Sequence, residues 1–202
     1  MEKLYKSLYS QECKLDLEKL KKTCKKLEDI VKELPVDYIW GNLKAQPNPP
    51  ATITKNDRYS FFTYPFSQVH NVYKAIQNFF YEAEKDYYGS NLKCNYFIKG
   101  WINVYYEHEF LAWHGHYYEA SRAWHGFFCV DTEPSITSYK FNDGFELDAV
   151  CKDSSIIMGL SDTNIHKTQK WYDKNRPRIT VAFDIIPEQN LQRSTSNVWI
   201  PI

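Results

Sequence analysis

The sequence lacks an excess of charge of either sign. Its 202 residues carry 25 lysines and arginines against 25 aspartates and glutamates, so the formal net charge is zero. A protein that binds nucleic acid over its surface usually carries a clear basic excess, so the composition predicts no overall nucleic-acid footprint. A local basic patch stays compatible with this balance.

Long apolar runs are also missing. No stretch approaches the roughly 20 consecutive apolar residues of a membrane-spanning helix, and residues 1–22 contain no apolar segment typical of a signal peptide. The odd number of cysteines and the absence of CxxC spacing favour free thiols over a disulfide framework or a thiolate metal site; the five are Cys13, Cys24, Cys94, Cys129 and Cys151. We therefore expect no membrane partner and an intracellular, cytoplasmic protein.

Aromatic residues are abundant. They make up 17% of the chain, with 16 Tyr, 12 Phe and 6 Trp, and the hydrophobic content is 43%. Flat rings suit the pleated surface of a sheet, so this composition favours a strand-rich globular protein. A chain of this length is sufficient for one substantial core, and we expect a single domain over residues 1–202.

The first 90 residues are expected to form helical support. In residues 12–34, apolar side chains recur at three- and four-residue steps, which predicts an amphipathic helix with a Lys/Glu outer face. Docking of this helix on its own domain is favoured over partner recognition. Residues 67–87 repeat the helical spacing, with Ser67 as N-cap and Gly89 as the end. Residues 35–65 are rich in proline and aromatics, so we expect a loop laid across the core.

From Leu92 onward the pattern changes to short strands. Turn signals such as Asn142-Asp143-Gly144 separate aromatic and β-branched segments. The segments are NYFIKGWINVYYE, FLAWHGHYY, AWHGFFCVD, ITSYKF, FELDAVC, SIIMGL and RITVAFDII. Many short strands in succession indicate an antiparallel barrel or sandwich. The fold class is thus mainly β with α: a double-stranded β-helix (jelly roll) at 91–187, helical support at 1–90 and a tail at 188–202.

Histidines provide the candidate metal site. In His114-Gly115-His116 two imidazoles are two residues apart, and in an extended chain such side chains leave the same face. His166 follows fifty residues later, after the apolar segment SIIMGL. Because a jelly roll brings distant strands side by side, His166 can complete a facial triad. Three protein ligands would leave three open positions on an octahedral iron.

An arginine follows the third histidine. Arg178 opens the apolar strand RITVAFDII, twelve residues beyond His166. A buried guanidinium is costly unless paired, and its two-pronged shape matches a carboxylate, with Thr180 able to add a hydrogen bond. Arg176 competes for this role. Pro177 separates the two, and Arg178 is favoured because it begins the continuous strand.

Taken in order, these motifs resemble the Fe(II)/2-oxoglutarate-dependent oxygenases. The resemblance is closest to a branch found in phages and bacteria and covers about residues 92–187. It depends on the first core strand Trp101-Ile102-Asn103-Val104-Tyr105, the HxH pair, the small-aromatic segment Gly126-Phe127-Phe128 and the last strand RITVAFDI. The phage relatives also leave a viral origin open.

The resemblance implies a reaction and a set of residues. The reaction would hydroxylate an unidentified substrate with O₂ while 2-oxoglutarate is decarboxylated to succinate. The Fe(II) ligands would be His114, His116 and His166. The 2-oxoglutarate site would contain Arg178 and Thr180, with Tyr105 and Asn103 able to reach the co-substrate. His125 and Trp124 are candidate pocket residues. His70 is expected to be a packed or surface histidine, and His108 is expected at the surface.

His116 departs from the pattern of that family, which usually has Asp or Glu there. A neutral imidazole leaves the iron with one more unit of positive charge. This keeps open a three-histidine, cupin-like dioxygenase that does not use 2-oxoglutarate, and a non-catalytic jelly-roll interaction protein. Glu119 is a possible substitute carboxylate, ranked lower because its odd offset from His116 turns it to the opposite face of a strand. The sequence predicts neither the prime substrate nor the oligomeric state.

Overall fold

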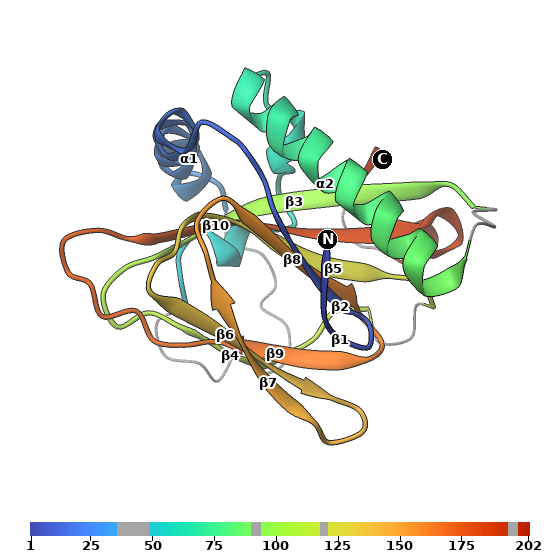
Figure 1. Cartoon of the computed structure of the whole chain (residues 1–202). Helices are drawn as coiled ribbons and strands as arrows, with labels where there is room; N and C mark the ends of the chain where they lie inside the picture. Colours follow the sequence, from blue (N-terminus) through green and yellow to red (C-terminus); the bar gives the residue numbers. More distant parts are fainter. Residues whose placement is uncertain (36–48, 90–93, 118–120, 194–197) are drawn as a thin grey trace.

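Two antiparallel sheets lie face to face and form the body of the protein (Figure 1). The computed structural model describes residues 1–35, 49–89, 94–117, 121–193 and 198–202. The large sheet has the order β1-β2-β8-β5-β10-β3-β11, with β1 Glu2–Tyr5, β2 Leu8–Glu12, β8 Ser155–Leu160, β5 Trp124–Asp131, β10 Arg178–Pro187, β3 Tyr96–Tyr105 and β11 Ile200–Pro201. The small sheet has the order β4-β9-β6-β7, with β4 Leu111–His114, β9 Asn164–Thr168, β6 Ser135–Phe141 and β7 Glu146–Cys151.

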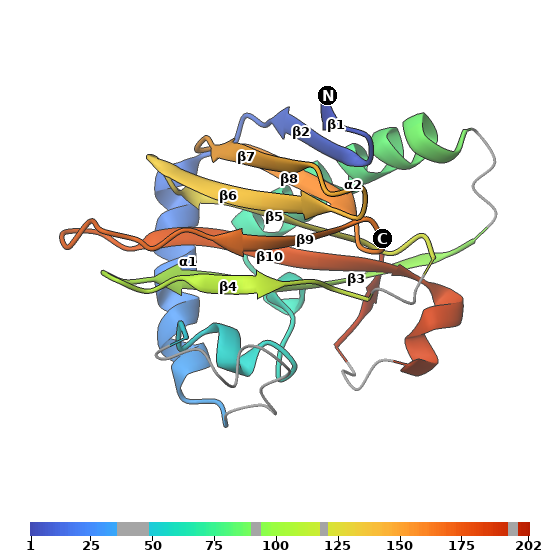
Figure 2. The same ribbon diagram turned by 90° about the horizontal axis from the view of Figure 1, so that it is seen from below.

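From β3 to β10 the chain passes repeatedly between the two sheets. Strands β3, β5, β8 and β10 join the large sheet, whereas β4, β6, β7 and β9 join the small one. Figure 2 shows the two layers stacked, with strands distant in sequence lying side by side. This interleaving is the double-stranded β-helix, so the predicted jelly roll is confirmed. It positions the end of β4, the middle of β9 and both ends of β10 around the space between the sheets.

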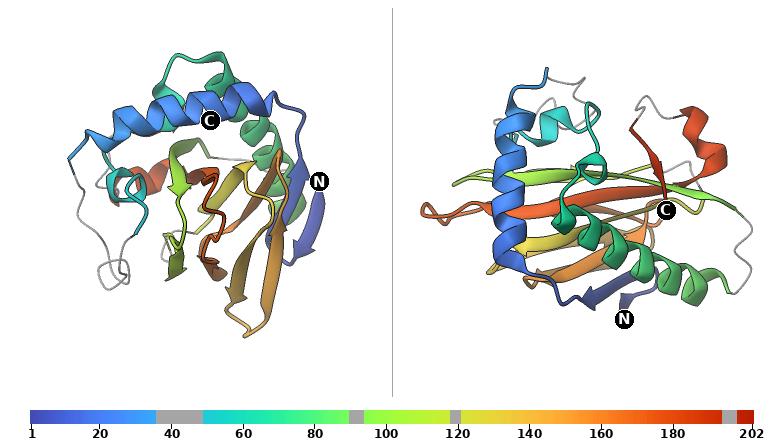
Figure 3. Two further views of the ribbon diagram at one scale, coloured as in Figure 1. Left: turned by 90° about the vertical axis from the view of Figure 1, so that its left-hand side faces the viewer. Right: turned by 90° about the horizontal axis from the view of Figure 1, so that it is seen from above.

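Two helices cover the outer face of the large sheet (Figures 1 and 3). They are α1, Leu17–Lys32, and α2, Ser67–Tyr88, and their apolar stripes belong to the same core cluster as the large sheet. Asp16 caps α1 by accepting from the Lys19 N–H at 3.1 Å. Ser67 is the first helical residue and not the N-cap as predicted: that position is occupied by Phe66, which has no capping oxygen. Gly89 ends α2 with φ +80°, as expected.

The sequence did not predict all of the strands. The hairpin of β1 and β2 adds to the edge of β8, where Leu8 pairs with Gly159, and Leu8 and Tyr9 are fully buried. Strand β9 was also missed, because five mostly polar residues show little of the alternation that marks a strand. Register against β4 and β6 makes it a strand. Pairing with distant segments therefore decides these elements.

The described part of the 35–65 segment lies across the core, as predicted. It contains two short 3₁₀ helices, Ile53–Lys55 and Phe61–Thr63, and several buried aromatic rings. Its hydroxyl groups also accept hydrogen bonds from the free edge of β3: Tyr59 Oη from Ile102 N at 2.9 Å, Thr52 Oγ1 from Val104 N at 3.1 Å and Ser60 Oγ from Gly100 N at 3.3 Å. The segment thereby satisfies backbone donors that an edge strand leaves unpaired.

No helix in the described ranges is long and apolar enough to cross a membrane. All five cysteines are free, and three of them, Cys24, Cys129 and Cys151, are buried.

Candidate metal centre

Three histidines converge between the sheets. His114 ends β4, and His166 lies directly opposite it on β9. His116 follows two residues after His114. One ligand atom from each of the three lies within 4.8 Å of the others. The ring centroids of His114 and His166 are 4.2 Å apart, and His116 is 5.3 Å from each. The structure thus brings together the three histidines selected from the sequence.

The protonation of these rings suits metal binding. The Nδ1 of His114 is 2.8 Å from the carbonyl oxygen of Ala112, and because a carbonyl only accepts, Nδ1 carries the proton and Nε2 is left as donor to a metal. Burial, together with the charge of His116, lowers the pKa of His114 to about 3. Burial and the neighbouring His114 lower the pKa of His166 well below its ordinary value. Both imidazoles are therefore neutral at pH 7, as a ligand must be.

His125 is a fourth imidazole in the same cluster. Its ring stacks on those of His116 and His166, with centroids 5.0 and 4.6 Å away. Its Nε2 is 3.1 Å from Asn164 Oδ1, and burial lowers its pKa to about 3. His125 therefore lines the site beside the three candidate ligands.

Trp124 does not line this site, contrary to the sequence prediction. It directly precedes His125 in β5, so alternation along the strand turns its indole to the other face of the sheet. There it contacts Phe80 and donates to Glu84 of α2 at 2.7 Å. The tryptophan that does reach the site is Trp101, whose ring stacks on His116 with centroids 6.1 Å apart.

Asp184 is a site residue that the sequence analysis missed. It lies on β10, is 3% exposed, and has its Oδ1 2.8 Å from His116 Nδ1. Burial works to raise the pKa of this carboxyl, but the imidazole of His116 and the ammonium of Lys99 outweigh burial, and the pKa is lowered overall. A signal was present in the sequence: Asp184 follows Arg178 by six residues, an even spacing that places both on one face of the strand.

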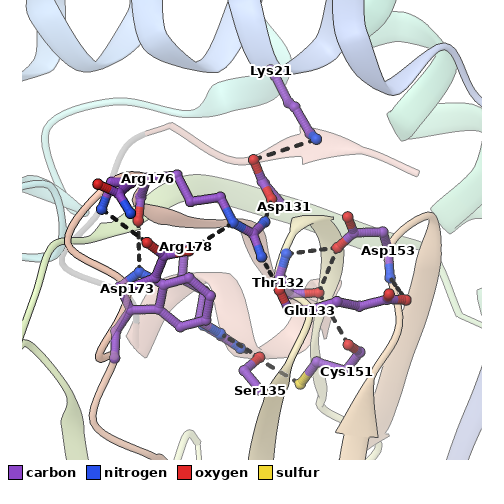
Figure 4. Close-up of polar contacts among 12 residues, drawn as sticks. Lys21, Asp131, Thr132, Glu133, Ser135, Cys151, Asp153, Asp173, Arg176 and Arg178 are labelled. Carbon is purple, nitrogen blue, oxygen red and sulfur yellow. Dashed lines mark hydrogen bonds and ion pairs between the residues drawn. The ribbon is translucent and has the colours of Figure 1, made fainter.

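Arg178 reaches from the large sheet toward the small one (Figure 4). Its Nε donates to Ser135 Oγ at 3.0 Å, and Nη2 lies 3.6 Å from Cys151 Sγ. The guanidinium also lies over the ring of Tyr105, 5.0 Å from the centroid. The residue is 2% exposed, and no carboxylate pairs with it in the described parts of the chain. It is a buried cation whose five N–H groups can donate to an anion in addition to these partners.

Arg176 has its own acidic partners. Its guanidinium contacts Asp131, and Nε donates to Asp173 Oδ2 at 3.1 Å (Figure 4). Asp131 is paired with Lys21 of α1 as well. These contacts lie toward the surface, with 38% of the Arg176 side chain exposed. Arg178, and not Arg176, is therefore the arginine that faces the space between the sheets.

Several buried polar atoms around this space have no hydrogen-bond partner among the described residues. They are Asn103 Oδ1, Tyr139 Oη and His166 Nδ1. Thr180 pairs with Asn103 across β10 and β3 and is buried beside it, and Tyr105 Oη is 3.5 Å from Thr168 Oγ1. Buried polar groups are normally satisfied, so these atoms are available to a polar group bound in this space. Asn103, Tyr105 and Thr180 thus line the region next to Arg178.

The remaining sequence candidates lie elsewhere. His108 is exposed, as expected, and His70, for which a packed or a surface position was open, is exposed as well. Glu119, the lower-ranked substitute for His116, is outside the described residues.

Comparison with solved structures identifies the fold. A Trichoplax adhaerens prolyl hydroxylase in complex with a hypoxia inducible factor oxygen degradation domain peptide superposes with a TM-score of 0.65, at 8% identity over 95% of this chain and 88% of that one. A Pseudomonas putida prolyl-4-hydroxylase gives 0.59 at 14% identity, over 89% and 92% of the two chains. The chain therefore has the jelly-roll fold of these two prolyl hydroxylases.

The similarity extends beyond prolyl hydroxylases. SnoN, a non-heme α-ketoglutarate-dependent epimerase from nogalamycin biosynthesis, gives a TM-score of 0.57 at 7% identity, over 90% of this chain and 78% of that one. No protein-family profile and no curated protein sequence matches the chain. Assignment to the phage and bacterial branch stays a prediction.

Proposed function

We propose that this protein is an Fe(II)/2-oxoglutarate-dependent oxygenase that hydroxylates a substrate. The observation that carries the proposal is the joint placement of two groups within one jelly roll. Three imidazoles converge from β4, its following turn and β9, and the buried guanidinium of Arg178 lies at the start of β10 without an acidic partner in the described residues. A metal and a dicarboxylic co-substrate would fill these two positions together.

Each group of residues has a distinct task. His114, His116 and His166 would hold Fe(II) on one side and leave positions open for the co-substrate and O₂. When bound, the iron and 2-oxoglutarate supply the oxidising chemistry, with release of succinate and CO₂. Arg178 would bind the distal carboxylate through its paired N–H groups.

Neighbouring side chains would keep the co-substrate region ordered and dry. The Arg178 guanidinium lies 5.0 Å from the ring centroid of Tyr105, a cation–π contact that would help to hold it in place. Thr180 and Asn103 offer polar atoms within the same buried face. Because water is excluded, the charge pairing between Arg178 and a carboxylate would be stronger than at the surface.

A second function is favoured by one observation. The third candidate ligand is His116, so the metal would be held by three histidines with no carboxylate among them. Such a set also suits a cupin-like dioxygenase that does not use 2-oxoglutarate. In that case Arg178 would bind a different acid.

Succinate formation separates these functions. The protein is purified without oxygen, loaded with Fe(II) and 2-oxoglutarate, exposed to air, and succinate is measured. We expect turnover by the wild type even without prime substrate, and loss of nearly all of it in His166→Ala. His108→Ala removes an exposed histidine and is the matched control, with unchanged turnover.

Two other results would favour other functions. Tight iron binding that is indifferent to 2-oxoglutarate would support the three-histidine dioxygenase. No metal binding at all would contradict both and support a non-catalytic jelly roll.

A further inference from the structure

A carboxylate lies directly behind the candidate metal ligands. The three histidines are all neutral ligands, which leaves the centre without the negative charge that a ligating carboxylate would supply. Asp184, buried on β10, has its Oδ1 2.8 Å from His116 Nδ1. We propose that Asp184 is a positioning residue that delivers this negative charge to the metal through His116. This inference depends on the metal site of the proposed function.

The geometry fits that role. If Nδ1 of His116 holds its proton toward Asp184, the lone pair of Nε2 is directed at the metal. The two atoms are close, yet Oδ1 of Asp184 has no aligned hydrogen bond among the described residues. Its accepting capacity is therefore not used by another donor, and it is available to the N–H of His116.

Stacking restricts the imidazole to the required plane. Trp101 lies against His116 at an interplanar angle of 18°, and His125 at 8° with centroids 5.0 Å apart. These rings hold the plane of His116 while leaving movement within that plane. The stacked rings therefore fix the tilt of the imidazole, and the nitrogen that lies beside the carboxylate is Nδ1.

Asp184 is not required to neutralise Lys99. Lys99 lies opposite Asp184 in the β3–β10 pairing, but its Nζ is 2.7 Å from Asp57 Oδ1. The ammonium also lies over the rings of Trp101 and Trp199. Because Lys99 already has a carboxylate partner, the charge of Asp184 remains available to His116.

A carboxylate hydrogen-bonded to a metal-bound imidazole raises the basicity of that ligand and fixes its tautomer. His116 and Asp184 would then act as one composite ligand with the net charge of a carboxylate. This would explain how His116 can occupy a position where the Fe(II)/2-oxoglutarate-dependent oxygenases usually have Asp or Glu. The negative charge is retained, one imidazole further from the metal.

The test is metal affinity, measured by titrating metal-free full-length protein with Co(II), which needs neither oxygen nor 2-oxoglutarate. Removal of such an orienting partner typically weakens metal binding about 10–100-fold, and we expect this loss for Asp184→Asn. Asp131→Asn is the matched control: it makes the same chemical change at another buried carboxylate of the large sheet, whose partners are Lys21 and Arg176. It should leave Co(II) affinity within about twofold, since it removes no partner of a metal ligand.

A second background shows whether the effect passes through His116. In His116→Asp the carboxylate becomes a direct ligand, so adding Asp184→Asn should then cost little affinity. An equal loss in both backgrounds would mean that Asp184 acts in another way and would overturn the inference. Asp184→Ser provides a second variant that lacks the carboxylate. The urea midpoint of each metal-free variant shows whether a loss of Co(II) affinity comes from a loss of folding.

The outcomes also separate this inference from the proposed function. If wild-type protein binds no Co(II), or binding survives His114→Ala and His166→Ala, the proposed metal site itself is wrong. If those variants lose binding while Asp184→Asn retains it, only the role of Asp184 is wrong.

Discussion

At the scale of single residues, burial determines which side chains can serve chemistry. Arg176 and Arg178 are two residues apart, yet one is saturated by acidic partners near the surface and the other is enclosed without one in the described chain. A buried unpaired guanidinium costs several kcal/mol unless something compensates it. Ser135 and Cys151 are weak partners for it. Arg178 is therefore the residue on which the proposed anion site depends.

We predict that Arg178→Ala weakens 2-oxoglutarate binding while leaving metal affinity intact. Loss of a charge-assisted bidentate pair removes about 1.5–3 kcal/mol, which corresponds to about 10–100-fold in affinity. Arg178→Lys keeps the charge but not the paired donors, so it should recover only part of the loss. Calorimetric titration of the anaerobic metal-loaded protein measures both effects.

Arg176→Ala is the control, since it removes an arginine two residues away and should leave co-substrate affinity near that of the wild type. Unchanged 2-oxoglutarate affinity in Arg178→Ala would show that this residue does not bind the co-substrate.

At the scale of elements, the exposed edge of β3 is closed by side chains and not by another full strand. Strand β11 pairs only with Phe97 and Ile98. Beyond that point, hydroxyls of the 49–66 segment accept from alternate backbone N–H groups of β3. This arrangement protects the edge from pairing with another chain. It also fixes the strand that carries Trp101 and Asn103 into the site.

We predict that Tyr59→Phe destabilises the protein by about 1–3 kcal/mol, because the N–H of Ile102 would be left buried without an acceptor. The ring itself is retained, so packing changes little. Chemical unfolding of the metal-free protein measures the loss. Tyr64→Phe makes the same change on a neighbouring half-buried tyrosine that contacts Tyr59. Equal stabilities of these two variants would argue against the role of the hydroxyl at the strand edge.

At the scale of the whole molecule, the two sheets enclose a cluster of four imidazoles, His114, His116, His125 and His166. Burial between the sheets disfavours the protonated form of these rings. A neutral imidazole can bind a metal ion, whereas a protonated one cannot. For His125 the folded-state pKa is about 3, below the ordinary value of about 6.5. As the pH falls below about 6.5, His125 is protonated in the unfolded chain but stays neutral in the folded protein. The free energy of unfolding therefore decreases.

We therefore predict that the metal-free protein loses stability between about pH 6.5 and pH 3, with His125 contributing up to about 1.4 kcal/mol per pH unit. In His125→Gln this contribution disappears, and the free energy of unfolding should fall less steeply with acid. Urea unfolding at pH 7 and pH 5 in the presence of a chelator gives the two slopes. Identical slopes would show that His125 is not held neutral by the fold.

The sequence by itself determined the local pieces. The 3.6-residue spacing of apolar side chains located α1 and α2, and turn signals located most strands of the jelly roll. The two-residue spacing placed His114 and His116 on one face, and the order of HxH, His166 and Arg178 indicated the chemistry. These features are local, because backbone periodicity acts over a few neighbouring residues.

Only the tertiary structure decided which distant residues meet. Strand β9 forms because it pairs with β4 and β6, and the β1–β2 hairpin forms because β2 pairs with β8. Trp124 points away from the site because it lies on the face of β5 that packs against α2. Asp184 reaches His116 only through the register of β10 between β3 and β5. Register depends on hydrogen bonds and packing between segments far apart in the chain, so no local pattern encodes it.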